Sequence, residues 1–221
     1  MSKIVQIAEL SIYGEEDQVI LENLSFNLER GEIAQLAGLS DQQYDALFHV
    51  LTGEISPDSG QVVLADRNVV RLSGKNRNKM LQQEVSFLPR AFTLPKGKTV
   101  REALKFKLET LGGVPEIEER LDDVIQLTEL AGVEERPTGD RDSLTRIKTG
   151  VALSVVSEPD LLICHETLSS LNSKEEEGFV ELLAKINEQK GLSILLLADE
   201  MKSGYGKIRV IEHKLDSRVI S

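Results

Sequence analysis

The stretch "DLLICHETLSSLNSKEEEGFVELLAKINEQKGLSILLLAD", residues 160–199, decides the fold. Its two short apolar runs, "DLLICH" and "LSILLLAD", are interpreted as buried strands, and residues 173–189 between them as a helix. Strands that are apolar along their whole length and separated by helices are typical of parallel sheets covered on both faces. The fold class predicted from this unit is therefore α/β.

Further strands and helices are predicted before and after this unit in the sequence. We expect strands at residues 3–10, 24–29, 32–38, 61–66 and 84–89, and a closing pair at 207–213 and 216–221. We expect helices at residues 99–111, 115–132 and 143–157. The basic clusters "GKNRNK" and "PKGK" are interpreted as exposed loops, the alternative being contact with anionic lipid heads.

The composition narrows the class of protein. The chain has 221 residues, of which 40% are hydrophobic, and a formal net charge of -11. This acidity disfavours nucleic acid as a partner, because binding to phosphates requires clustered Lys and Arg. No apolar run approaches the roughly 20 residues that span a bilayer, the start lacks a signal-peptide pattern, and the single cysteine excludes an internal disulfide. We expect a cytoplasmic protein.

The turn "AGLSDQQYDAL", residues 37–47, joins a predicted strand to a predicted helix. In an α/β protein such a turn often holds phosphate with several glycines, but here only Gly38 is present. Ser40 and Gln43 have the spacing of a capping box, and Asp41 suits the positive end of a helix dipole. We therefore expect the end of this helix to be closed by its own side chains.

Four segments in order carry a resemblance to a known family. They are "VILENLSFNLERGEIAQLAGLS", "LTGEISPDSGQVVLADRNVVRLS", "VSFLPRAFTLPKGKTVREAL" and "EPDLLICHETLSSLN". From about Val5 to about Val219 the chain resembles the nucleotide-binding subunit of an ABC transporter, nearest to the FtsE and lipoprotein-release (LolD) types. The resemblance implies a P-loop NTPase-type ABC ATPase fold, with a mixed sheet core, an antiparallel β subdomain and an α-helical subdomain.

The resemblance also implies a domain organisation. Residues 1–221 would form a single ABC ATPase-like domain. Its core with the β subdomain would comprise residues 1–88 and 158–221, and the helical subdomain about residues 89–157.

The family's phosphate loop, G-x-S-G-x-G-K-S/T, is only partly matched. Its lysine falls on Tyr44 and its magnesium-binding Ser/Thr on Asp45, and only Gly38 and Ser40 agree. Asp41 and Asp45 would place negative charge where the phosphates lie, so we expect ATP and Mg²⁺ binding to be lost. The alternative is that another loop shape still admits a nucleotide.

The other motifs of the family depart from its pattern in the same way. The resemblance pairs the magnesium carboxylate with His165, the water-polarising residue with Glu166 and the Q-loop glutamine with Arg90. It pairs the switch histidine with Asp199, the D-loop aspartate with Asn172 and the signature with residues 141–144. Tyr13 falls on the aromatic that stacks on adenine, although packing is the alternative reading of a lone tyrosine.

These departures predict a catalytically inactive pseudo-ATPase, with Glu166, His165, Asp199 and Arg90 as vestiges of its site. Such a chain would scaffold or regulate an FtsX/LolC-like permease in a cell-division membrane complex, lying peripherally at the inner face of the cell membrane. One alternative is the partner subunit of a heterodimeric ABC ATPase that still binds nucleotide at a shared site. Another is a soluble regulatory module with a different ligand in the cleft.

A groove between core and helical subdomain is the predicted partner site. Its residues would be Phe87, Arg90, Phe92, Leu94 and Pro95, which could receive a helix of the permease. The alternative is a hinge between subdomains. The expected partners are a membrane permease and a second copy of the chain or an active ABC ATPase.

We expect no metal site at Cys164 and His165. Neighbouring residues of a strand point to opposite faces, and His49 and His213 have no ligand spacing to either of them. Cys164 is interpreted as a small core residue.

Overall fold

The computed structural model describes residues 2–138, 143–167, 171–199 and 208–213. The strands are β1 Lys3–Tyr13, β2 Val19–Glu29, β3 Ile33–Ala37, β4 Ser59–Leu64, β5 Arg67–Asn68, β6 Val85–Leu88, β7 Leu161–His165, β8 Ser193–Leu197 and β9 Arg209–Glu212. The helices are α1 Asp41–Thr52, α2 Gly74–Gln83, α3 Val100–Leu111, α4 Ile117–Leu127, α5 Ser143–Val155 and α6 Ser173–Lys190, with short 3-10 turns at Glu15–Asp17 and Val69–Arg71.

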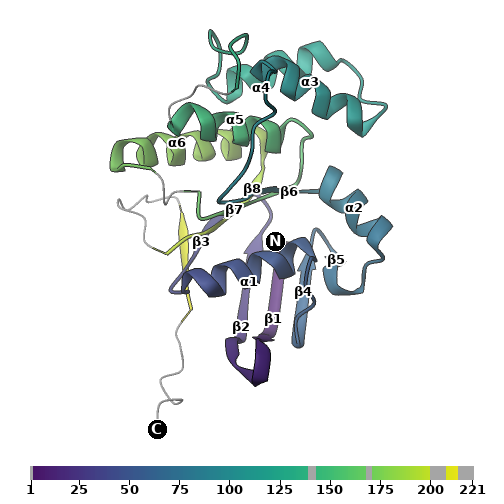
Figure 1. Ribbon diagram of the computed structural model, residues 1–221, viewed down its shortest axis with the longest axis vertical. Coiled ribbons are helices and arrows are strands. Elements are labelled where there is room, and N and C mark those ends of the chain that lie inside the picture. Colours follow the sequence, from purple (N-terminus) through teal and green to yellow (C-terminus); the bar gives the residue numbers. More distant parts are fainter. Residues whose placement is uncertain (1, 139–142, 168–170, 200–207, 214–221) are drawn as a thin grey trace.

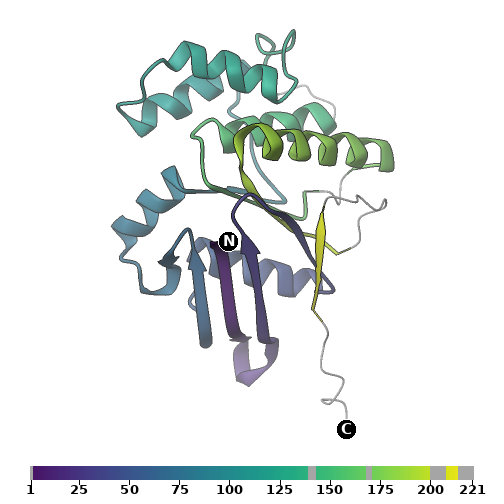
Figure 2. The ribbon, with the colours of Figure 1, turned by 180° about the vertical axis from the view of Figure 1, so that it is seen from behind.

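The strands form two sheets of different kinds. An antiparallel sheet has the strand order β2-β1-β4-β5, and a parallel sheet has the order β6-β7-β8-β3-β9. Figure 1 shows α1 between the two sheets and α3 to α6 beyond the other face of the parallel sheet; Figure 2 shows the same layers from behind. The expected α/β architecture, with an antiparallel part and a helical part, is confirmed.

Alternation of side chains explains why the parallel strands are apolar throughout. In β7, Ile163 belongs to the core cluster shared with α1 and the antiparallel sheet. Its neighbours Leu162 and Cys164 belong to the cluster shared with α3 to α6. Because successive residues of a strand point to opposite faces, a strand covered on both sides needs apolar side chains at every position.

Most predicted elements are present, but two regions differ from expectation and one predicted strand is not tested. β1 continues to Tyr13 and β2 begins at Val19, so the hairpin is longer than expected. The cluster "GKNRNK", expected as a loop, forms the first part of α2, and this prediction was wrong. The predicted strand at 216–221 lies outside the described residues. Among the described helices, none is long and apolar enough to cross a membrane.

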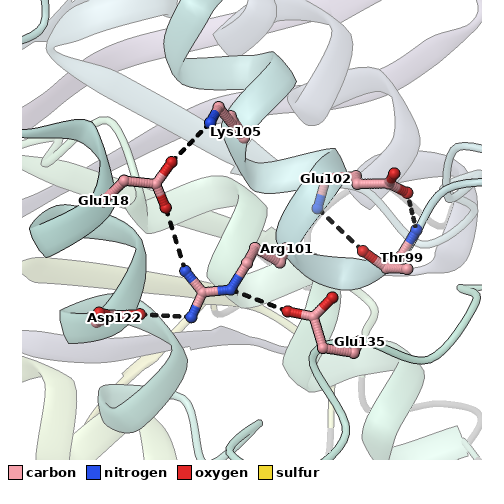
Figure 3. A network of polar contacts seen from close by, with 7 residues as sticks. All are labelled: Thr99, Arg101, Glu102, Lys105, Glu118, Asp122 and Glu135. Carbon is pink, nitrogen blue, oxygen red and sulfur yellow. Dashed lines mark hydrogen bonds and ion pairs between the residues drawn. The ribbon is translucent and has the colours of Figure 1, made fainter.

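An ion-pair network joins α3 to its neighbours in the helical layer (Figure 3). Arg101 of α3 forms ion pairs with Glu118 and Asp122 of α4 and lies 3.1 Å from Glu135 in the segment that follows. At the start of α3, Thr99 and Glu102 form a capping box. The network links α3 to α4 and to the segment that follows α4.

Candidate functional site

The candidate site lies at the carboxyl edge of the parallel sheet. β3, β6, β7 and β8 all end there, and the turn after β3 leads into the amino end of α1. Gly38 in that turn has φ of 85°, and a Cβ built on it would lie 2.9 Å from the His213 carbonyl oxygen. Glycine therefore permits the close approach that this turn requires.

The predicted capping box at α1 is confirmed. The Ser40 side chain accepts a hydrogen bond from the Gln43 amide at 3.4 Å, and Gln43 Oε1 accepts one from the Ser40 amide at 2.9 Å. Gln43 Nε2 also donates to the Ile20 carbonyl at 2.9 Å, which ties the helix end to β2. Within the described chain, the amides of Asp41 and Gln42 have no acceptor. The cap thus leaves two outward-pointing donors.

Tyr44 and Asp199 bind other parts of this turn. Tyr44, at the position of the family's lysine, is buried and donates its hydroxyl to the Leu36 carbonyl at 3.0 Å. Burial raises the pKa of its phenol, so the group stays neutral. The Gly38 amide donates to Asp199 Oδ1 at 3.1 Å. The Asp199 carboxylate is therefore the hydrogen-bond acceptor for one amide of this turn.

Asp45, His165 and Glu166 come together from α1 and the end of β7. The ligand atoms of these three side chains all lie within 4.8 Å of one another. His165 is only 5% exposed, and its ring stacks on Phe48 with centroids 4.5 Å apart. Although Asp45 Oδ1 lies 3.2 Å from His165 Nε2, this nitrogen has no hydrogen-bond partner among the described residues.

Arg90 supplies the positive charge beside this cluster. Its Nη1 donates to Glu166 Oε2 at 2.6 Å and lies 3.5 Å from Asp41 Oδ2. Burial raises the pKa of Glu166, as do Asp41 and Asp45, while Arg90 opposes the rise. Burial lowers the pKa of His165 and Arg90 lowers it further, while Asp45 opposes the shift, so the imidazole is held neutral.

Other predicted site residues lie elsewhere or have other contacts. Tyr13, at the end of β1, is 37% exposed and its amide donates to Asp58. Asn172 caps α6 by accepting from the amides of Lys174 and Glu175. Ser143 begins α5, and residues 141 and 142 of the predicted signature lie outside the described part.

Of the residues predicted for a partner groove, Arg90 and Phe92 lie together at one pocket and the others have different surroundings. Arg90 and Phe92 line a pocket of about 290 Å³, and the rest of its lining is Ala91, Ser143, Arg146, Ile147 and Thr167. The Arg146 guanidinium covers the Phe92 ring at 5.2 Å. Phe87 packs against Phe48 instead, and Leu94 is buried. Neither Phe87 nor Pro95 is among the residues that line this pocket.

Comparison with known proteins shows the family to which the chain belongs. The family model described as "ABC transporter" matches residues 21–169. A methionine import ATP-binding protein MetN of Geobacillus kaustophilus is 32% identical over 203 residues, 91% of this chain and 57% of that protein. The MetN of Bacillus subtilis is 30% identical over 183 residues, 82% of this chain and 53% of that protein. The chain thus spans little more than half the length of these relatives.

Solved structures share the fold. CbiO1 from Clostridium perfringens, part of the ABC transporter complex CbiONQ, superposes with a TM-score of 0.80 at 21% identity, covering 90% of this chain and 80% of that one. The ATP-binding cassette MJ0796, in a dimeric structure bound to ADP and Pi, gives 0.75 at 19% identity, covering 89% and 88%. The predicted ABC ATPase fold is confirmed.

Several functional predictions are corrected by these relatives. They are named as ATP-binding proteins, which contradicts the predictions of an inactive pseudo-ATPase and of lost ATP and Mg²⁺ binding. They are named for methionine import, which contradicts a cell-division role with an FtsX/LolC-like permease. The physical reason lies in the turn, because the cap uses the amides of Ser40 and Gln43 and leaves two others available.

Sequence reasoning missed two groupings at this site. It did not foresee that Arg90 pairs with Glu166, or that Asp45 meets His165. A signal was present, because His165 ends β7, Glu166 and Arg90 follow β7 and β6, and Asp45 lies in the helix after β3. The ends of parallel strands and the helices that follow them converge at one edge of a sheet.

Proposed function

Since the chain belongs to the ABC transporter family, we propose that it is the ATP-binding subunit of an ABC-type importer. The observation that carries this proposal is the match to the family model over residues 21–169, which includes both the turn after β3 and the end of β7. The names of the relatives favour methionine, or an amino acid like it, as the imported solute.

The triphosphate would lie against the amino end of α1. The amides of Asp41 and Gln42 point out of the helix end, where the helix dipole favours an anion. Tyr13, exposed at the end of β1, is proposed to stack on the base. Asp199 would release the Gly38 amide when a phosphate oxygen takes its place.

Arg90 is proposed to supply the charge that a lysine gives in the family's pattern. Its side chain is 47% exposed and reaches both Asp41 and Glu166, so a rotation can turn it toward a phosphate. Asp41 and Asp45 add negative charge, so we expect ATP to require a divalent cation for binding. Guanidinium is suited to phosphate because it donates in a planar fork.

The partners are proposed on the same basis. A membrane permease would carry the solute, and two ATP-binding subunits would pair beneath it, as copies of this chain or with a related subunit. We further propose that residues 89–157 act as a helical subdomain, because α3, α4 and α5 share one core cluster. The pocket beside Arg90 and Phe92 is the proposed docking point for the permease.

Calorimetric titration of the purified chain with ATP and Mg²⁺ or Mn²⁺ tests the proposal. We expect saturable binding that falls about tenfold or more in Arg90→Ala, because a charge-assisted contact to phosphate is removed. Arg71→Ala, in the short turn at Val69–Arg71, is the matched control and should bind as the parent does. Absence of binding in the parent with either cation would contradict the proposal.

A further inference from the structure

We propose that Asp45, His165 and Glu166 form a binding site for a divalent metal ion that readily takes nitrogen ligands, such as Zn²⁺ or Co²⁺. The site goes beyond the proposed ATP binding, because it is built only from side chains of this chain and needs no nucleotide. It also departs from the Mg²⁺ that the family pattern implies, since one of its ligands is an imidazole.

The spacing of the donor atoms fits one ion. His165 Nε2 lies 3.2 Å from Asp45 Oδ1 and 3.9 Å from Glu166 Oε2. In a tetrahedral site with bonds of about 2.0–2.1 Å, neighbouring ligand atoms are about 3.3 Å apart. These two separations bracket this value and the third pair of ligand atoms lies within 4.8 Å, so side-chain rotations can bring all three atoms into the first shell of a single ion.

The buried imidazole nitrogen is the second observation that points to a ligand. His165 is 95% buried, and its Nε2 has no hydrogen-bond partner in the described structure. A buried polar atom without a partner costs free energy that a bound ion would recover. Phe48 stacks on the ring, and the nitrogen lies 3.2 Å from Asp45 Oδ1 and 3.9 Å from Glu166 Oε2.

The donor set selects the class of ion. Mg²⁺ prefers oxygen ligands in an octahedron and retains several waters, whereas imidazole suits Zn²⁺ and the late first-row metals. One nitrogen and two carboxylate oxygens therefore favour Zn²⁺ or Co²⁺ over Mg²⁺. Three protein ligands leave a fourth position for water or for a phosphate oxygen.

Arg90 competes with the ion for the same carboxylate. Its Nη1 lies 2.6 Å from Glu166 Oε2 and acts as the internal cation of the metal-free site. An arriving ion must share Glu166 with this guanidinium or displace it. Removal of the guanidinium should therefore strengthen ion binding.

The test is a titration of the full chain with Co²⁺ in the absence of nucleotide, followed by visible absorption. We expect a saturable band that Zn²⁺ abolishes and a hundredfold excess of Mg²⁺ does not. Asp45→Asn should weaken Co²⁺ binding at least about tenfold, and because Asp45 is 54% exposed this variant should fold normally. His49→Ala, which removes an exposed histidine of α1, is the matched control and should leave the titration unchanged.

Two further variants examine the ligand and its competitor. His165→Asp should reduce the preference for Co²⁺ over Mg²⁺ by at least about tenfold, because it replaces nitrogen with oxygen. Arg90→Gln should tighten Co²⁺ binding by about threefold or more. No Co²⁺ band, or a band that Asp45→Asn and His165→Asp leave unchanged, would overturn the site. Because nucleotide is absent throughout, failure here is distinct from failure of ATP binding.

Discussion

Ser40 caps α1 with its side chain, at the point where the helix meets the candidate site. Its replacement by alanine removes the acceptor for the Gln43 amide, so Ser40→Ala should lower the free energy of unfolding by about 1 kcal/mol. Urea unfolding followed by circular dichroism measures the change. Ser173→Ala is the control, because Ser173 begins α6 but Asn172 provides that cap. Equal stability of parent and Ser40→Ala would contradict the role of the cap.

Cys164 is the only cysteine of the chain and lies buried in β7. Burial raises the pKa of its thiol to about 12, so the reactive thiolate is strongly disfavoured at neutral pH. We expect the native protein to resist a disulfide-exchange reagent at pH 8 and to react fully once unfolded in urea. The release of the chromophore measures this, and rapid labelling of the native chain would show that the thiol is accessible.

For individual side chains, the sequence predicted contacts between residues close in the chain and missed contacts between residues far apart in it. The capping box follows from residues three apart, so Ser40 and Gln43 could be paired by spacing alone. Asp45 and His165 are 120 positions apart, and only the sheet order brings them within 3.2 Å. The negative charge at the site was overestimated for the same reason. Arg90, which comes from a separate segment, forms ion pairs with Asp41 and Glu166.

Among the elements, α3 and α4 share an apolar cluster and are also linked by ion pairs of Arg101. This side chain is 27% exposed and meets Glu118, Asp122 and Glu135. Arg101→Met should lower the free energy of unfolding by about 1 kcal/mol, since a network is worth more than a single exposed pair. The loss should shrink in 1 M salt, where the screening length falls to about 3 Å.

Thermal and urea unfolding at low and high salt measure both effects. Arg71→Met is the matched control, because Arg71 is exposed and forms no ion pair within the described residues. A loss for Arg101→Met that is independent of salt would show that packing of the side chain, and not charge, stabilises the pair of helices.

Element prediction succeeded where the apolar pattern was strong. The strands of the parallel sheet and the amphipathic α6 were expected close to their observed bounds, and α4 was expected in the right place but ends five residues earlier than predicted. α2 was missed because "GKNRNKMLQQ" has only one buried residue, Met80, so its sequence carries almost no periodic signal. Its helical state depends on the surroundings, with Arg77 reaching the Gly53 and Leu72 carbonyls.

In the whole molecule, the parallel sheet is covered by two separate apolar clusters. Leu195 and Leu196 are adjacent in β8 but belong to different clusters. Either residue changed to alanine should lower the free energy of unfolding by about 2–5 kcal/mol, because each deletion opens a cavity in a packed layer. Ile55→Ala, at a site that is 41% exposed, is the control and should cost much less.

Chemical denaturation of the three variants measures these losses. We expect one cooperative transition in every case, since both clusters share the same strands. A large loss for only one of the two leucines would contradict the two-sided covering of the sheet.

The side chains near His165 belong to different elements. Asp45 lies in α1, Glu166 follows β7, and Arg90 follows β6. The distance of 3.2 Å between Asp45 Oδ1 and His165 Nε2 therefore depends on how α1 packs against the parallel strands. An ion bound by Asp45, His165 and Glu166 would therefore link α1 to the end of β7 and stabilise the packing of these two layers.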